Sequence, residues 1–130
     1  MFDYSVINDS PTRVFTTAGS LEGGAFTAVA LGASGITTAG ASSVAIGLLT
    51  GENELPIPEG EDVTVQLTGG GYWLAGESIA AGDLLTSGAG GKAVKAASGD
   101  FIFAQALSNG GASSAVEVQI IRGGYKYELN

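Results

Sequence analysis

The segment Gly76–Leu107 alternates short apolar runs with glycine-rich turns more regularly than any other part of the chain. Three turns, at residues 80–82, 88–91 and 98–100, separate the runs Leu84–Leu85, Lys92–Ala96 and Phe101–Ala104. Such runs between glycine-rich turns predict β-strands. Strands this short cannot bury a core on their own. The rest of the chain must therefore complete their sheet or attach it to a partner.

Strand patterns also occur on both sides of this segment. The flanking candidates are residues 13–17, Ala25–Leu31, Val44–Leu49, Asp62–Thr68 and Ala115–Arg122. The second and third are apolar on both faces, as in strands that are buried on two sides. The last two place an aliphatic residue at every second position, which is typical of a strand with one buried face. We predict an all-β fold: a small β-barrel or β-sandwich-like domain of short strands, with little or no helix.

The chain has 130 residues, a length that fits one domain. Its first residues alternate as Phe2, Tyr4 and Val6 and end in the turn sequence Asn-Asp-Ser-Pro. We interpret residues 1–12 as an extended N-terminal arm, which is either an edge strand of the same domain or an arm laid on a partner. Residues 13–130 then form a single all-β domain, with 62–122 as its best-defined β-unit.

Two loops and one aromatic pair are candidates for contact with other molecules. The segment Gly32–Ser43 is rich in small residues and predicts a flexible surface loop or, through Ile36 and Thr37, an ordered subunit contact. The acidic segment Gly51–Asp62 predicts a solvated loop or a weak cation site, although it lacks the spacing of a calcium-binding loop. Trp73, which follows Tyr72, is expected either in the core or as an anchor at a subunit interface.

Composition restricts the function. The chain holds 22 glycines and few aromatic residues, so a monomer would have a thin core and subunit contacts are expected to add stability. The net charge of −8, with five Lys and Arg, disfavours binding to nucleic acid and to anionic membranes. There is no cysteine, which is consistent with a reducing cytosol. The N-terminus does not resemble a secretory signal, and no apolar run is long enough to span a bilayer.

Two short motifs imitate catalytic sequences but lack essential parts. Residues 76–80 (GESIA) resemble the serine elbow of esterases, yet the chain contains no histidine to act as a general base. Residues 88–92 (GAGGK) resemble a phosphate loop, but the required first glycine and the final Ser or Thr are missing. Without His or Cys, transition metals have no good ligand set. We expect no enzymatic activity, no catalytic residues, no cofactor and no metal.

From about Val63 onward the sequence resembles the small phage head decoration proteins, a group that includes capsid cement proteins of the DUF2190 type. The resemblance rests on DVTVQLTGG, GESIAAGDLLTSGAGGKAVKA, DFIFAQAL and AVEVQII, about half of the chain. The positions that match the family pattern are Gly82, Asp83, Leu84, Gly91, Ala93, Val94, Ala106, Val116 and Val118.

This resemblance implies a structural virion protein that stabilises the phage head. Such a decoration or cement protein, commonly a homotrimer, binds the major capsid protein on the outer surface of the shell, after assembly in the host cytoplasm. The candidates for capsid contact are Phe2, Tyr4, Val6, Tyr125 and Tyr127. The candidates for the subunit interface are Trp73, Tyr72, Ile36 and Thr37. An alternative is a phage fibre or adhesin-type β-module that binds glycans through Trp73, Tyr72 and Tyr125.

Overall fold

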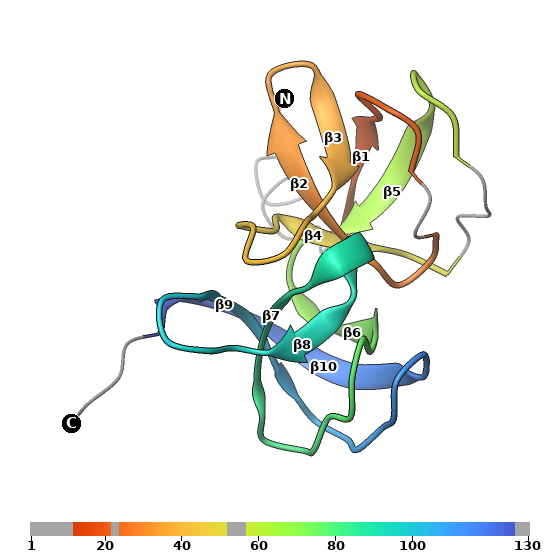
Figure 1. Ribbon diagram of the computed structural model, residues 1–130. Helices are drawn as coiled ribbons and strands as arrows, with labels where there is room; N and C mark the ends of the chain where they lie inside the picture. Colours follow the sequence, from red (N-terminus) through yellow and green to blue (C-terminus); the bar gives the residue numbers. More distant parts are fainter. Residues whose placement is uncertain (1–11, 22–23, 52–56, 127–130) are drawn as a thin grey trace, which may run out of the picture.

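A computed structural model describes residues 12–21, 24–51 and 57–126 and contains two five-stranded antiparallel sheets (Figure 1). The first sheet has the order β1-β5-β4-β2-β3 and the second the order β6-β10-β9-β7-β8. The strands are β1 (Thr12–Thr16), β2 (Ala28–Gly32), β3 (Gly35–Thr38), β4 (Gly47–Leu49), β5 (Asp62–Gln66), β6 (Gly69–Leu74), β7 (Leu84–Ser87), β8 (Ala93–Lys95), β9 (Phe101–Ala106) and β10 (Ala115–Tyr125). A single turn of 3₁₀ helix, η1 (Ala89–Gly91), joins β7 to β8. The predicted all-β fold of short strands is confirmed.

Each sheet curls until its two outer strands meet. In the first sheet an isolated parallel bridge joins Thr17, just after β1, to Ile36 in β3. In the second sheet an equivalent bridge joins Ala75, just after β6, to Ala93 in β8. Closing a sheet in this way removes its exposed edges. We refer to the two closed sheets as the first barrel (β1–β5) and the second barrel (β6–β10).

The second barrel repeats the first. Adding five to each strand number converts the order of the first sheet into that of the second. The register repeats as well: Phe15 lies opposite Val63 in the first barrel, and Trp73 lies opposite Val116 in the second. Leu49 pairs with Val65 in the first barrel. Their counterparts in the second barrel, Ala106 and Val118, lie 57 and 53 positions further along the chain and also pair with one another. The chain therefore folds as two copies of one supersecondary unit.

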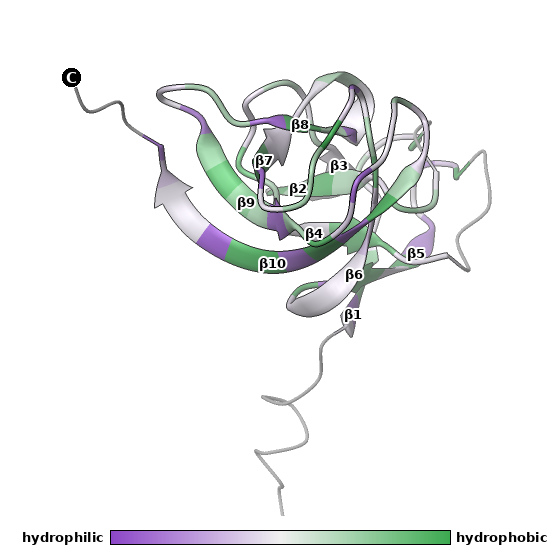
Figure 2. Ribbon diagram, turned by 90° about the horizontal axis from the view of Figure 1, so that it is seen from below, coloured by the Kyte–Doolittle hydropathy of each residue, from purple (hydrophilic) through white to green (hydrophobic). Residues whose placement is uncertain are grey.

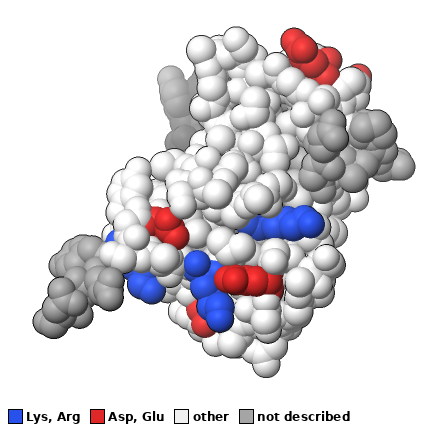
Figure 3. All heavy atoms as spheres, in the orientation of Figure 1, with Lys and Arg blue, Asp and Glu red and all other residues white. Residues whose placement is uncertain are grey.

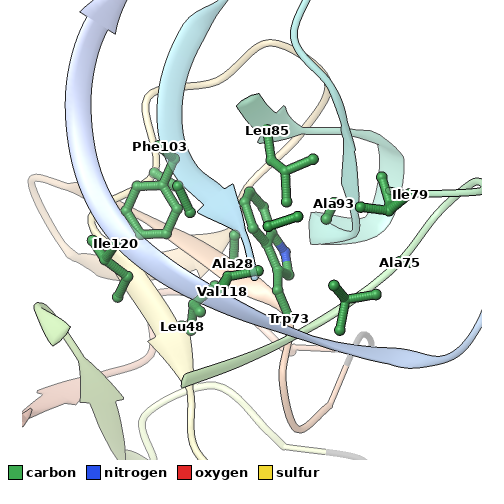
Figure 4. Packing of buried hydrophobic residues seen from close by; sticks show 14 of the residues in the cluster. Ala28, Leu48, Trp73, Ala75, Ile79, Leu85, Ala93, Phe103, Val118 and Ile120 are labelled. Carbon is green, nitrogen blue, oxygen red and sulfur yellow. The ribbon is translucent and has the colours of Figure 1, made fainter. Parts of the chain in front are cut away.

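Alternating burial along the strands forms two clusters of apolar side chains. β10 has three inward-facing apolar residues separated by polar ones, visible as alternating green and purple in Figure 2. One cluster fills the first barrel and includes Leu21, Val29 and Val65. The other fills the second barrel but also takes Ala28 and Leu48 from the first (Figure 4). The cluster of the second barrel thus extends across the junction into the first barrel.

Three expectations about local structure are corrected. The segment Gly32–Ser43 is not a loop throughout, because residues 35–38 form β3 and pair with β2. The strand expected over Ala25–Leu31 starts only at Ala28, since a turn at residues 25–26 places Phe26 at a φ of 66°. The β-unit expected over 62–122 is divided, because β5 completes the first barrel and the second begins at β6. Among the described residues, no helix has the length and apolar character needed to cross a membrane.

Candidate interaction surfaces

The junction between the barrels shows which surfaces this fold uses for contact. The Leu74 amide donates a hydrogen bond of 2.7 Å to the Phe26 carbonyl, and the ring of Phe26 meets that of Tyr72 edge to face at 6.0 Å. The Ser42 amide donates a bond of 2.8 Å to the Ser87 carbonyl. Apolar burial and these bonds hold the barrels together. The second barrel thus receives the first on the surface around β6 and the β7–β8 hairpin.

Trp73 lies at the centre of this junction. Its Nε1 donates a bond of 2.8 Å to the Gly91 carbonyl. Its ring meets that of Phe103 edge to face at 5.4 Å, and Figure 4 shows both side chains in the core. Gly91 has a φ of +74°, and a Cβ there would come 2.7 Å from the Ala28 carbonyl oxygen. Only glycine combines this conformation with so close an approach. A buried indole whose N–H is satisfied is a typical stabilising core residue.

The C-terminal part of β10 covers the other end of the second barrel. Beyond a bulge, Gly124 pairs with Ile102 and Tyr125 with Phe101 in β9. The Gly99 amide donates a bond of 2.6 Å to the Lys126 carbonyl. The residue of the first barrel that corresponds to Gly99 is Ser42, and its amide donates a hydrogen bond to the Ser87 carbonyl of the second barrel. The end of β10 and Lys126 therefore cover the surface of the second barrel that corresponds to the surface of the first barrel at the junction.

The corresponding receiving surface of the first barrel is uncovered by the described residues. Trp73 and Ser87 are buried against the first barrel. Phe15, the equivalent of Trp73, is half-buried, and Leu31, the equivalent of Ser87, is 56% exposed. Val14, the equivalent of Tyr72, is 59% exposed. In Figure 1 the β2–β3 hairpin beside this surface points away from the second barrel. We call Val14, Phe15 and Leu31 the open face of the first barrel.

Charge is distributed unequally between the repeats. Residues 1–66 carry one Arg against eight Asp and Glu, a net charge of −7. Residues 67–130 carry four Lys and Arg against five Asp and Glu, a net charge of −1. Glu59, Glu61 and Asp62 are exposed where the chain enters β5, and acidic atoms appear at the upper end of the first barrel in Figure 3. The Thr16 hydroxyl ties Asp62 to β1 with a bond of 2.9 Å.

One carboxylate also bridges the junction. Asp100 accepts a bond of 2.8 Å from the Ala97 amide through one oxygen and one of 2.8 Å from the Ser42 hydroxyl through the other. The Ala97 amide, the Ser42 hydroxyl and the positive charge of Lys126 lower the pKa of Asp100 below its ordinary value of 3.8, against a smaller opposing effect of desolvation. This carboxylate therefore links the β8–β9 turn to the first barrel in its charged form.

The structure separates the residues that were expected at a subunit interface. Trp73 and Ile36 are fully buried within a single chain, so neither offers side-chain surface to a second subunit, and both belong to the core. Tyr72 and Thr37 are exposed. Trp73 packs in the cluster that spans the junction, and Ile36 packs inside the first barrel. A subunit interface at the exposed Tyr72 and Thr37 stays a prediction. Burial of Trp73 also removes the main stacking platform expected for glycans.

The residues expected to contact a capsid fall mostly outside the described residues. Phe2, Tyr4, Val6 and Tyr127 belong to that group. Tyr125 is described and is 64% exposed, with its ring edge to face against Phe101 at 5.5 Å. Its exposed side remains available for contact.

The two imitations of catalytic motifs form structural turns. Ser78 is an exposed residue between the bridges at Ala75 and Ile79. Residues 88–92 form the η1 turn, and the Gly88 amide donates a bond of 2.7 Å to the Lys92 carbonyl. The part of the chain that the structure describes contains no group of three acidic residues arranged to hold a metal ion.

The open face and the junction were not anticipated from the sequence. The signal that could have found them is the internal repeat, which is clearest in VTVQL of β5 and VEVQI of β10, 53 positions apart. Elsewhere the repeat is masked, because equivalent core positions hold different residues, such as Phe15 and Trp73. Aligning the two halves would have marked Leu31 as the counterpart of Ser87.

No family model and no curated protein matches the sequence. Among solved structures, the fold is similar to that of the N base of the head fiber protein gp8.5 of bacteriophage phi29. The TM-score is 0.65 at 18% sequence identity, and the match covers 89% of this chain and 98% of that one. The likeness therefore extends over both barrels.

Proposed function

We propose that the chain is a structural, non-enzymatic protein of a phage head. In this proposal it binds the major capsid protein on the outer surface of the shell and stabilises it as a decoration protein. The observation that carries the proposal is the likeness to the head fiber base, because it covers almost the whole of both chains. A protein of this kind needs stable surfaces that repeat around the shell, and it needs no catalytic group.

The proposed assembly is a homotrimer. Small closed barrels leave little room for a large core, and the chain exposes further apolar side chains on both barrels, among them Val44 and Tyr125. Contacts between subunits would cover part of this surface. Analytical ultracentrifugation of the purified protein tests the assembly directly. A single species at the monomer mass of 12.9 kDa at micromolar concentration contradicts it.

A particle experiment tests the function. Heads of the phage that encodes the chain are purified with and without the gene and are imaged by electron cryomicroscopy. We expect density for the protein on the outer surface in the first sample alone, and earlier release of DNA from the second sample on heating. Particles whose composition and heat resistance are the same in both samples contradict the proposal.

A second candidate function is the base of a head fibre, which the neighbouring structure favours directly by its own description. In that case the trimer would carry further chain away from the shell. Glycan binding at this base would have to use Tyr72 and Tyr125, since Trp73 is buried. If the wild-type protein gives no signal on a glycan array, the hypothesis that this fibre base binds glycans is contradicted.

A further inference from the structure

The internal repeat predicts how the first barrel is used. The second barrel is covered at both ends: the first barrel lies on its receiving surface, and the end of β10 lies on its other end. Within residues 12–21, 24–51 and 57–126, the first barrel is covered only at the junction, where Ala28 and Leu48 enter the cluster of the second barrel. In repeat proteins each unit contacts its neighbours through matching surfaces. The described residues cover the receiving surface of the second barrel but not that of the first.

The exposure of matched residues marks the uncovered surface. Ser87 is 1% exposed and its counterpart Leu31 is 56% exposed. Trp73 is fully buried and its counterpart Phe15 is half-buried. The contact made by Tyr72 to Phe26 has no described counterpart at Val14. Large apolar side chains at positions that form an interface in the sister barrel indicate an interface here too.

The charges select the kind of partner. Two first barrels facing one another would bring together two halves of net charge −7. The opposite end of a second copy is closed by Tyr125 and Lys126, so it does not present the surface that the first barrel presents at the junction. Glu59, Glu61 and Asp62 are exposed beside β1, whereas Arg13 lies over the Phe15 ring at 5.4 Å. A partner that suits the open face therefore has an apolar centre and a rim that is basic where it faces Glu59, Glu61 and Asp62. We infer that the open face docks onto such a surface of the phage shell, with the first barrel toward the shell and the second barrel outward.

This inference rests on the proposed function and names the surface that carries it out. The test compares two double variants of the full chain. Val14→Asp/Leu31→Asp changes the open face, and Leu107→Asp/Ile121→Asp changes two exposed apolar residues of the second barrel. Both variants add the same charge. Folding of each is checked by the emission of Trp73 and by the midpoint of urea denaturation.

Binding is measured by cosedimentation with heads assembled without the protein, from the phage that encodes it. We expect the open-face variant to bind at least about tenfold more weakly than wild type, because apolar anchors at an interface centre dominate affinity. The second-barrel variant should bind like wild type. Binding of the wild type should weaken between about 50 mM and about 500 mM NaCl, as expected for oppositely charged rims.

The outcomes separate this inference from the proposed function. If the wild-type protein does not bind heads, both the proposed function and the docking partner inferred here are wrong. If wild type binds and the open-face variant binds equally well, or if only the second-barrel variant loses binding, the function stands and the docking surface is wrong. If the open-face variant loses its oligomeric state in ultracentrifugation, the open face is a contact between subunits and the inference is overturned. Binding that does not change with salt overturns the assignment of a basic rim.

Discussion

Gly91 of the second barrel lies directly against the backbone of Ala28 in the first. A Cβ on Gly91 would approach the Ala28 carbonyl oxygen to 2.7 Å and its amide nitrogen to 3.1 Å. The Gly91 carbonyl also accepts the Trp73 indole N–H. One glycine thus brings the two barrels into contact and positions the largest side chain of the core.

The first prediction concerns this contact. Gly91→Ala should destabilise the protein by about 3 kcal/mol, because it adds a clash with backbone to an unfavourable positive φ. Gly90→Ala is the matched control, since Gly90 has a φ of +70° but no atom within 4 Å of its Cβ position. It should cost only about 1 kcal/mol. Urea denaturation measures both, and equal losses would show that the close approach to Ala28 is unimportant.

The second prediction compares Trp73 with Phe15, its counterpart in the first barrel. Trp73→Ala should lower the free energy of unfolding by about 3–5 kcal/mol, since the indole is fully buried. Phe15→Ala should lower it by about 1–2 kcal/mol, because the ring is half-buried under Arg13. Circular dichroism in urea detects both losses. A larger loss at Phe15 would contradict the assignment of Trp73 to the shared core.

The third prediction follows from the lowered pKa of Asp100. A carboxylate whose pKa is lower in the folded than in the unfolded chain stabilises the fold above its unfolded pKa, and this stabilisation disappears as the pH falls through the folded value. Asp100→Ala should therefore lower Tm at pH 7 more than at a pH well below 3.8, the ordinary value.

A double-mutant cycle identifies the partner responsible. Ser42→Ala removes the hydroxyl that donates to Asp100 across the junction. We expect Ser42→Ala and Asp100→Ala to be coupled at pH 7, and the coupling to shrink in acid. Additive effects at pH 7 would mean that this hydrogen bond does not join the barrels in solution.

The fourth prediction is that the two barrels unfold together. Ala28, Ala39, Ala45 and Leu48 of the first barrel belong to the same buried cluster as Trp73. Opening either barrel exposes that shared cluster, so a half-unfolded state is unfavourable. The fluorescence of Trp73 and the far-UV circular dichroism should give the same midpoint in urea. In Phe15→Trp/Trp73→Phe, a tryptophan in the first barrel should again follow the circular dichroism. Two separated transitions would refute cooperative unfolding.

Several elements were predictable because their signal is local. The period of two in VTVQL and AVEVQI places Val63, Val65, Val116 and Val118 inside the barrels, as observed. The absence of long helices also follows from short apolar runs between glycines. The hairpin at residues 88–92 was recognised as a turn because the phosphate-loop spacing was wrong.

Other features depend on residues far apart in the chain. The pattern around Ile36 did not reveal a strand, because the burial of that side chain depends on Thr17 and on the closure of the first barrel. Trp73 could have been at an interface or in the core, and the choice is made by Gly91 of η1 and Ala28 of β2.

The sequence alone determined that this protein is built from short strands with alternating burial, because side-chain period and turn residues act over a few positions. It also held the repeat, in the two similar segments 53 positions apart. Tertiary structure decided that the repeats share a core, that the chain end covers one barrel, and that Leu31 is exposed where Ser87 is buried. Burial is a property of what lies opposite a residue in space, and only the closed barrels bring those residues together.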